Sequence, residues 1–301
     1  MFSPHEDNEC TVKARSLFQQ SVLQFRKNRF AVFGLIVIAA LFIIALGTIA
    51  VDIATDNEFY NTHVINQNLS LRLAPPSAEH IFGCDEFGRD IFLRIIWGTK
   101  YSLFIGIGAL ILALAIGMPL GMISGYYGGK IDDFIMRIMD VILAVPFMLM
   151  ALAIVAALGT STINLLIALS VSNIARFSRI ARASVMTVKD NEYIEAARAI
   201  GASDLRIMFR YVLPNSLAPN LVQVSLSIGD SILQIAGLSY LGLGVQPPTP
   251  EWGSLLTSAK MYMRDAWHIS VFPGVFLIIA VIAFNLLGDG VRDALDPKLK
   301  R

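Results

Sequence analysis

The chain has 301 residues, of which 55% are apolar and only 16% are charged. Soluble domains usually carry about 25% charged residues, so this composition indicates a membrane protein. The net charge of +1 gives no reason to expect nucleic-acid binding. The two cysteines, Cys10 and Cys84, lie far apart and suggest neither a disulfide framework nor a zinc site.

Six apolar segments approach the length of about 20 residues that a membrane-spanning helix needs. The first is longer than the core of a signal peptide, so we expect it to be retained in the membrane. Polar residues dilute the fourth segment. The sequence therefore predicts an all-α membrane protein with six transmembrane helices, over residues 30–51, 101–123, 135–158, 163–177, 217–244 and 269–287.

The distribution of charge orients these segments. Residues 11–30 contain five basic and no acidic side chains, whereas residues 52–100 contain seven acidic and four basic ones. Because Lys and Arg near span ends concentrate on the cytoplasmic side, both termini are predicted to be cytoplasmic. The predicted units are a cytoplasmic N-terminal tail (1–29) and a transmembrane domain (30–301), with an extracytoplasmic loop (52–100) and a cytoplasmic loop (178–216).

A charged segment between the fourth and fifth spans, residues 189–215, predicts two short helices joined by a turn. Gly201 favours a left-handed helix end, and Ser203 can cap the following helix. Pro214 is expected to end that helix. Each helix is expected to carry one apolar stripe at helical spacing, formed by Tyr193, Ala197 and Ile200 and then by Leu205, Met208, Phe209 and Val212.

This helical bracket has three possible roles. It could pack on the inner face of its own chain, read DNA as a helix-turn-helix, or dock in a groove of a cytoplasmic partner. Attachment to membrane spans at both ends argues against DNA reading. The residues alone favour docking only modestly over self-packing.

The sequence of the bracket, EAARAIGASDLRIMFRYVLP, resembles the EAA loop of ABC-importer permeases. The resemblance implies the type I ABC importer permease fold, and it implies that the loop forms a coupling helix seated in a cleft of an ATP-binding subunit. Tyr211 stands where the family often has isoleucine. The resemblance assigns ATPase coupling to Glu195, Ala196, Ala197, Gly201, Leu213 and Pro214.

Three further stretches, 83–95, 239–253 and 287–301, resemble the dipeptide and oligopeptide permease C-type subunit. Cys84 occupies a position where that family usually has threonine. The resemblance implies a multi-pass protein of the bacterial cytoplasmic membrane that imports dipeptides or oligopeptides. Its implied partners are a homologous B-type permease, two ATP-binding subunits that hold ATP and Mg, and an extracytoplasmic solute-binding protein. Related permeases import glutathione or nickel chelates, and these substrates remain alternatives.

The chain carries no sequence motif for its own energy source. A P-loop requires Gly-x-x-x-x-Gly-Lys-Ser/Thr, but Gly129-Lys130 is followed by Ile131 and has Ser124 at the first glycine position. We also find no metal-ligand spacing, so we expect a non-catalytic subunit that binds no cofactor or metal. The rival classes are an ion-coupled secondary transporter, which would typically show more spans and paired broken helices, and a membrane-embedded enzyme.

Two acidic residues lie in or near apolar segments. Charges at bilayer depth are costly and usually face the interior of a helix bundle. Asp140 is expected to pair with Arg137 near the membrane surface. Asp230 either lines the translocation path or forms a structural hydrogen bond, and Asn285 is a second candidate for the path. Residues 246–252 either contact the binding protein or serve a structural role.

Overall fold

The computed structural model of the protein describes residues 17–295, a range in which helices and loops make up the fold. Five of its helical segments are long and apolar enough to cross a membrane. They are α2 (Arg29–Ala54), α3 (Ile91–Tyr127), α6 (Thr162–Lys189), α9 (Leu213–Tyr240, continuous with preceding helical turns from Asp204) and α11 (His268–Leu295).

The predicted third span is not one straight helix. It divides into α4 (Gly129–Ala144) and α5 (Phe147–Leu158), which are bent by 93° relative to each other. The bend lies at Val145, which is extended (φ −90°, ψ 127°) because the ring of the following Pro146 disfavours a helical conformation there. The third predicted span, over 135–158, is therefore present as a bent pair of helices and not as one straight helix.

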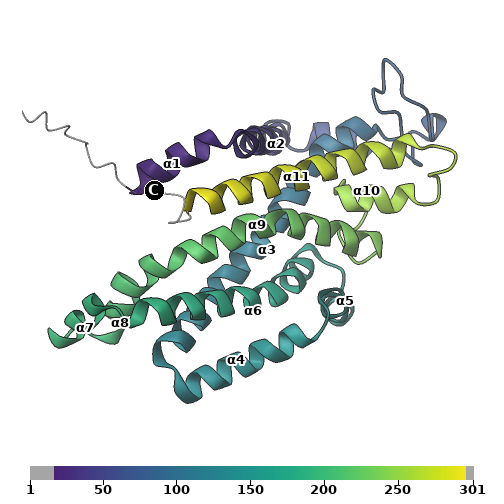
Figure 1. Ribbon diagram of the computed structural model, residues 1–301. Helices are drawn as coiled ribbons and strands as arrows, with labels where there is room; N and C mark the ends of the chain where they lie inside the picture. Colours follow the sequence, from purple (N-terminus) through teal and green to yellow (C-terminus); the bar gives the residue numbers. More distant parts are fainter. Residues whose placement is uncertain (1–16, 296–301) are drawn as a thin grey trace, which may run out of the picture.

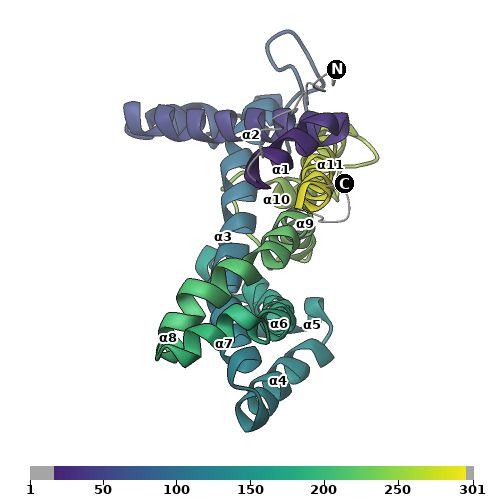
Figure 2. The ribbon, with the colours of Figure 1, turned by 60° about the vertical axis from the view of Figure 1, so that its left-hand side comes forward.

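The helices form a stack that α3 crosses. In Figure 1, α11, α9, α6 and α4 follow one another from top to bottom, while α3 passes behind them. Figure 2 shows α3 running from the neighbourhood of α2 and α10 (Trp252–Ala259) to that of α4. The short helices α7 (Glu192–Ala199) and α8 (Asp204–Ile207) lie at the left of Figure 1. Helix α10 and the loop before α3 lie at its right.

Small residues allow α3 and α6 to pack closely along most of their length. Gly117, Gly121 and Gly125 form a glycine seam on α3, and a methyl group added at Gly121 would lie 2.2 Å from the carbonyl oxygen of Ser178. The Ser178 hydroxyl donates a hydrogen bond to the Gly117 carbonyl at 3.0 Å. Such seams let helix backbones approach each other in lipid. Helices α3 and α6 therefore form the central rib of the molecule.

Helix α2 is fastened to this rib by a buried polar contact. Asp52, in the last turn of α2, accepts a hydrogen bond of 2.8 Å from the Trp97 indole and forms an ion pair with Lys100. Both members of the ion pair are largely buried. Removal of one partner would leave an uncompensated buried charge, so the pair fixes how α2 lies against α3.

The segment before α2 and the loop before α3 each contact a part of the chain that is distant in sequence. The short helix α1 (Leu17–Lys27) packs on α11, and the Asn28 side chain donates to Asp293 at 3.4 Å. At the other end, the loop before α3 contains a π-helical turn (Tyr60–Val64) and a 3₁₀ turn (Leu69–Leu71). Arg72 of this loop contacts the Tyr262 hydroxyl, between α10 and α11, at 3.1 Å.

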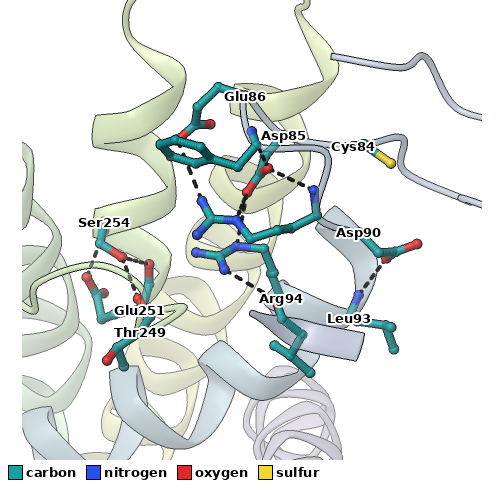
Figure 3. A network of polar contacts seen from close by, with 12 residues as sticks. Cys84, Asp85, Glu86, Asp90, Leu93, Arg94, Thr249, Glu251 and Ser254 are labelled. Atoms are coloured by element: carbon teal, nitrogen blue, oxygen red, sulfur yellow. Dashed lines mark hydrogen bonds and ion pairs between the residues drawn. The ribbon is translucent and has the colours of Figure 1, made fainter. Parts of the chain in front are cut away.

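The motif at 83–95 forms a compact turn that starts α3 (Figure 3). Asp85 accepts hydrogen bonds from the backbone of Phe87 (2.9 Å) and from the backbone and side chain of Arg89 (3.0 and 2.7 Å). Asp90 caps α3 by accepting from the backbone of Leu93 at 2.9 Å. These contacts hold the turn together and begin α3, so this part of the signature shapes the loop.

Candidate functional site: the coupling segment

Residues 190–215, here called the coupling segment, form a helical hairpin that continues from α6 into α9. Gly201 separates α7 from α8 and has φ of +81°, a conformation that a side chain would strain. Ser203 occupies the position before α8, but its side chain makes no capping hydrogen bond. The prediction of two short helices around Gly201 is confirmed at this level.

Pro214 does not end a helix as predicted. Helix α8 leads into a π-helical turn, Met208–Val212, and then directly into α9, so Pro214 lies within the first turn of α9. The turn is closed by a hydrogen bond from the backbone of Leu213 to the Met208 carbonyl. A wide π turn accommodates a proline, which has no N–H and crowds the preceding turn. The hairpin therefore continues into α9 as uninterrupted helical structure.

The buried face of the hairpin differs from the predicted stripes. The side chains of Ile194, Ala197, Ile207, Met208 and Val212 are buried in a cluster with the ends of α3 and α6. By contrast, four predicted stripe residues are exposed. These are Tyr193 (44% exposed), Ile200 (83%), Leu205 (65%) and Phe209 (59%), here called the coupling patch.

The predicted coupling residues divide between these two faces. Glu195 and Ala196 are exposed beside the coupling patch, whereas Ala197 is buried and holds α7 against the rib. A Cβ at Gly201 would meet no atom within 4 Å, so backbone conformation and not space calls for glycine there. Leu213 and Pro214 begin α9, and Leu213 packs against the buried cluster.

Contacts that no sequence pattern indicates hold the hairpin to the end of α3. The Tyr126 hydroxyl donates a hydrogen bond to the Asp204 carboxylate at 2.7 Å. The Arg198 guanidinium lies 5.4 Å from the centre of the Tyr126 ring. Hydrogen bonding to Tyr126 raises the pKa of Arg198 above its ordinary value. Tyr126 thus links α3, α7 and α8, although 78 positions separate it from Asp204.

The root of the hairpin is fixed as well. The Lys189 ammonium group, at the end of α6, donates to the Gly125 carbonyl at 2.8 Å. This contact adds to the glycine seam, so the α6 end cannot shift without moving α3. The geometry is that of a short rigid arm attached to the rib, with an apolar patch facing away from the molecule.

The two candidates for the translocation path lie on helices that cross closely near Gly229. Asp230 and Asn285 are both exposed, on α9 and α11 respectively. The Asn285 side-chain oxygen lies only 2.7 Å from where a Cβ on Gly229 would stand, so the helices cross closely beside Asp230. Asp140 does not pair with Arg137 as predicted, but with Arg179 of α6.

The C-terminal end of the segment at 246–252 has a structural role, because its residues are buried and one of them caps α10. Glu251 and Trp252 are fully buried. The Glu251 carboxylate accepts hydrogen bonds from the hydroxyls of Ser102 (3.1 Å) and Ser239 (2.8 Å), and it caps α10. Gln246 remains exposed. In the described range, 17–295, no group of three or more His, Cys, Asp or Glu is placed to hold a metal ion.

Comparison with known proteins agrees with this geometry. Residues 117–301 match the family model described as "Binding-protein-dependent transport system inner membrane component". Residues 16–76 match the "N-terminal TM domain of oligopeptide transport permease C".

Among curated proteins, the chain is 45% identical over 298 residues to the "Dipeptide transport system permease protein DppC" of Alkalihalophilus pseudofirmus, covering 99% of this chain and 95% of that protein. It is 48% identical over 225 residues to the "Glutathione transport system permease protein GsiD" of Pectobacterium atrosepticum, covering 75% of each.

A solved structure of the MetNI methionine ABC transporter, in inward-facing conformations, has a chain of similar fold. The TM-score is 0.56 at 17% identity, and the match covers 68% of this chain and 98% of that chain. At this identity the likeness concerns the fold alone, which is that of an ABC importer permease. With the family match over more than half of its length, this multi-pass bacterial inner-membrane protein belongs to the binding-protein-dependent transport system inner membrane components.

Proposed function

We propose that the protein is a transmembrane permease subunit of an ATP-driven importer that moves dipeptides or oligopeptides across the cytoplasmic membrane. The observation that carries this proposal is the coupling patch, an exposed apolar surface on a rigid hairpin continuous with α6 and α9. Exposed apolar side chains grouped on a short helix suit a helix-in-groove contact. The relatives named above are permeases of dipeptide and glutathione systems.

In this proposal the coupling segment and both termini face the cytoplasm, and the loop over 52–100 faces outward. A homologous B-type permease completes the pore, and two ATP-binding subunits, which hold ATP and Mg, lie beneath the pair. A solute-binding protein delivers the peptide from outside. Asp230 and Asn285 lie on the face turned toward the pore, because a polar pair exposed at mid-helix is costly against lipid.

The coupling patch can be tested with two substitutions of equally exposed residues at opposite ends of the molecule. Ile200 is 83% exposed in the patch, and Met261, between α10 and α11, is 82% exposed. Ile200→Glu places a charge in the proposed groove contact, so at least about a tenfold loss of co-purified ATP-binding subunits is expected. Met261→Glu is expected to leave this co-purification unchanged. An equal effect of both variants, or of neither, would contradict the proposal.

Glutathione is the second candidate substrate, because a glutathione-system permease is 48% identical over 225 residues. The substrate is identified by ATP-dependent uptake of a labelled dipeptide into proteoliposomes that contain the complete transporter and its binding protein. We expect unlabelled dipeptide, and not glutathione, to compete. Competition by glutathione alone would assign the system to the second substrate.

A further inference from the structure

Helix α4 lies between two breaks in the helical chain. Gly128 and Gly129, at its start, have φ of +65° and +54°, and a side chain at either position would meet no atom within 4 Å. At its end lies the 93° bend before Pro146. Only one side chain of α4, Met139, is buried. Neither the two breaks that flank α4 nor the packing of apolar side chains therefore determines where this helix lies.

Two ion pairs connect α4 to α6 of the central rib, and the better buried of them is Arg182–Asp132. The Arg182 guanidinium of α6 contacts both oxygens of Asp132, from Nε at 2.6 Å and from Nη2 at 2.5 Å. Ser124 of α3 also donates its hydroxyl to Asp132. Two-pronged Arg–carboxylate contacts fix orientation as well as distance. Asp132 is thus the point at which α3, α4 and α6 meet.

The cleft beside this contact is lined mainly by charged side chains, so apolar packing does not replace the ion pair. This cleft of about 330 Å³ separates α4 from α6, lined by Asp132, Asp133, Met136, Asp140, Arg179 and Arg182. A second ion pair, Arg179–Asp140, crosses the same cleft, but its side chains are 49% and 47% exposed. The side chains of Arg182 and Asp132 are 33% and 14% exposed. Solvent-exposed ion pairs contribute little to stability, so the less exposed Arg182–Asp132 pair is the main contact that holds α4 to α6.

We propose that Arg182 and Asp132 are positioning residues of the transport cycle, and that their ion pair makes α4 move together with α6. This inference rests on the proposed function, in which displacement of the coupling segment drives α6. Helix α5, beyond the bend, packs through Ala151 and Val155 against the opposite half of α6. Only a shift of α4 relative to α6 would therefore change the bend at Val145 and Pro146.

The two ion pairs across the cleft provide matched variants in the complete reconstituted transporter. Arg182→Ala and Asp132→Ala are expected to lower ATP-dependent dipeptide uptake at least about tenfold while the subunits stay assembled. Arg179→Ala and Asp140→Ala should stay within about twofold of the unaltered protein. Exchange of the charges, Arg182→Asp with Asp132→Arg, should recover part of the lost uptake. Equal effects at both pairs, or no gain from the exchange, would overturn the inference.

A distance measurement tests the same idea without any substrate. In the assembled complex lacking Cys10 and Cys84, spin labels are attached at Phe134→Cys on α4 and Met186→Cys on α6, both exposed positions. The label separation should stay within about 2 Å between the nucleotide-free and ATP-bound states. Addition of Arg182→Ala should make the separation state-dependent. A change in the unaltered pair would overturn the inference, whereas failed dipeptide uptake alone would count against the proposed function.

Discussion

The structure gives the thiol of Cys84 an environment in which it is inert. The side chain is fully buried at the turn before α3. Burial, reinforced by the neighbouring charges of Asp90 and Asp85, raises the pKa of Cys84 to about 11. Because the thiolate is the reactive form, both burial and the raised pKa protect the residue near neutral pH.

We therefore predict that Cys84 resists alkylation in the folded protein. In the Cys10→Ser variant, maleimide should label almost no protein at pH 7.5 until denaturant is added. Labelling without denaturant should remain slow at pH 8.5 as well, since the thiolate forms only as the pH approaches the raised pKa. A chain with Cys10→Ser, Cys84→Ala and Ile200→Cys is the exposed control and should react within the mixing time. Fast labelling of Cys84 at pH 7.5 would contradict the assigned burial.

At the scale of single helices, close approach of α3 and α6 depends on the glycine seam. A Cβ at Gly121 would lie 2.2 Å from a backbone oxygen and 2.7 Å from the Ala181 Cβ. Backbone cannot move aside as a side-chain end can, so the two helices would have to separate. On the same helix, a Cβ at Gly108 would meet only the end of the Leu166 side chain, at 3.2 Å.

Gly121→Ala should accordingly destabilise the protein by about 1–3 kcal/mol, the usual cost of overpacking. Gly108→Ala should be neutral or slightly stabilising, because alanine is favoured over glycine in helices by about 1 kcal/mol. Thermal unfolding of the detergent-solubilised chain, followed by tryptophan fluorescence, measures the difference. Identical transition temperatures for the two variants would show that the seam does not constrain helix packing.

Hydrophobic length and the motifs located most of the helices, and they placed the coupling segment between the correct spans. They could not predict the break at Val145. Pro146 follows it, but membrane helices often contain proline without breaking, so the proline alone does not indicate a break. The buried face of the coupling hairpin was missed because apolar residues occur on both of its faces. Tyr126 lies far from the segment in sequence, and only the folded chain brings it there.

At the scale of the whole molecule, contacts between distant segments fix the number of membrane crossings. The loop before α3 touches the loop between α10 and α11 through Arg72 and Tyr262, so both lie on one side. Between the coupling segment and the latter loop lie α9, which is long enough to span the membrane, and the eight-residue α10, which is not, so the coupling segment must lie on the opposite side. An odd number of crossings is then required between α3 and α6. The bent pair α4–α5 therefore counts as one crossing, which gives six within the described residues 17–295.

This count can be tested with a membrane-impermeant maleimide and single cysteines at exposed positions of a cysteine-free chain. Met261→Cys and Thr160→Cys, which follows α5, should react from one side of the membrane. Ile200→Cys and Lys130→Cys, at the start of α4, should react only from the other side. If Lys130 and Thr160 reacted from the same side, α4 and α5 would re-enter the membrane without crossing it. That result could not hold together with the Arg72–Tyr262 contact, so the labelling pattern tests the bend, the loop contact and the relative placement of the coupling segment together.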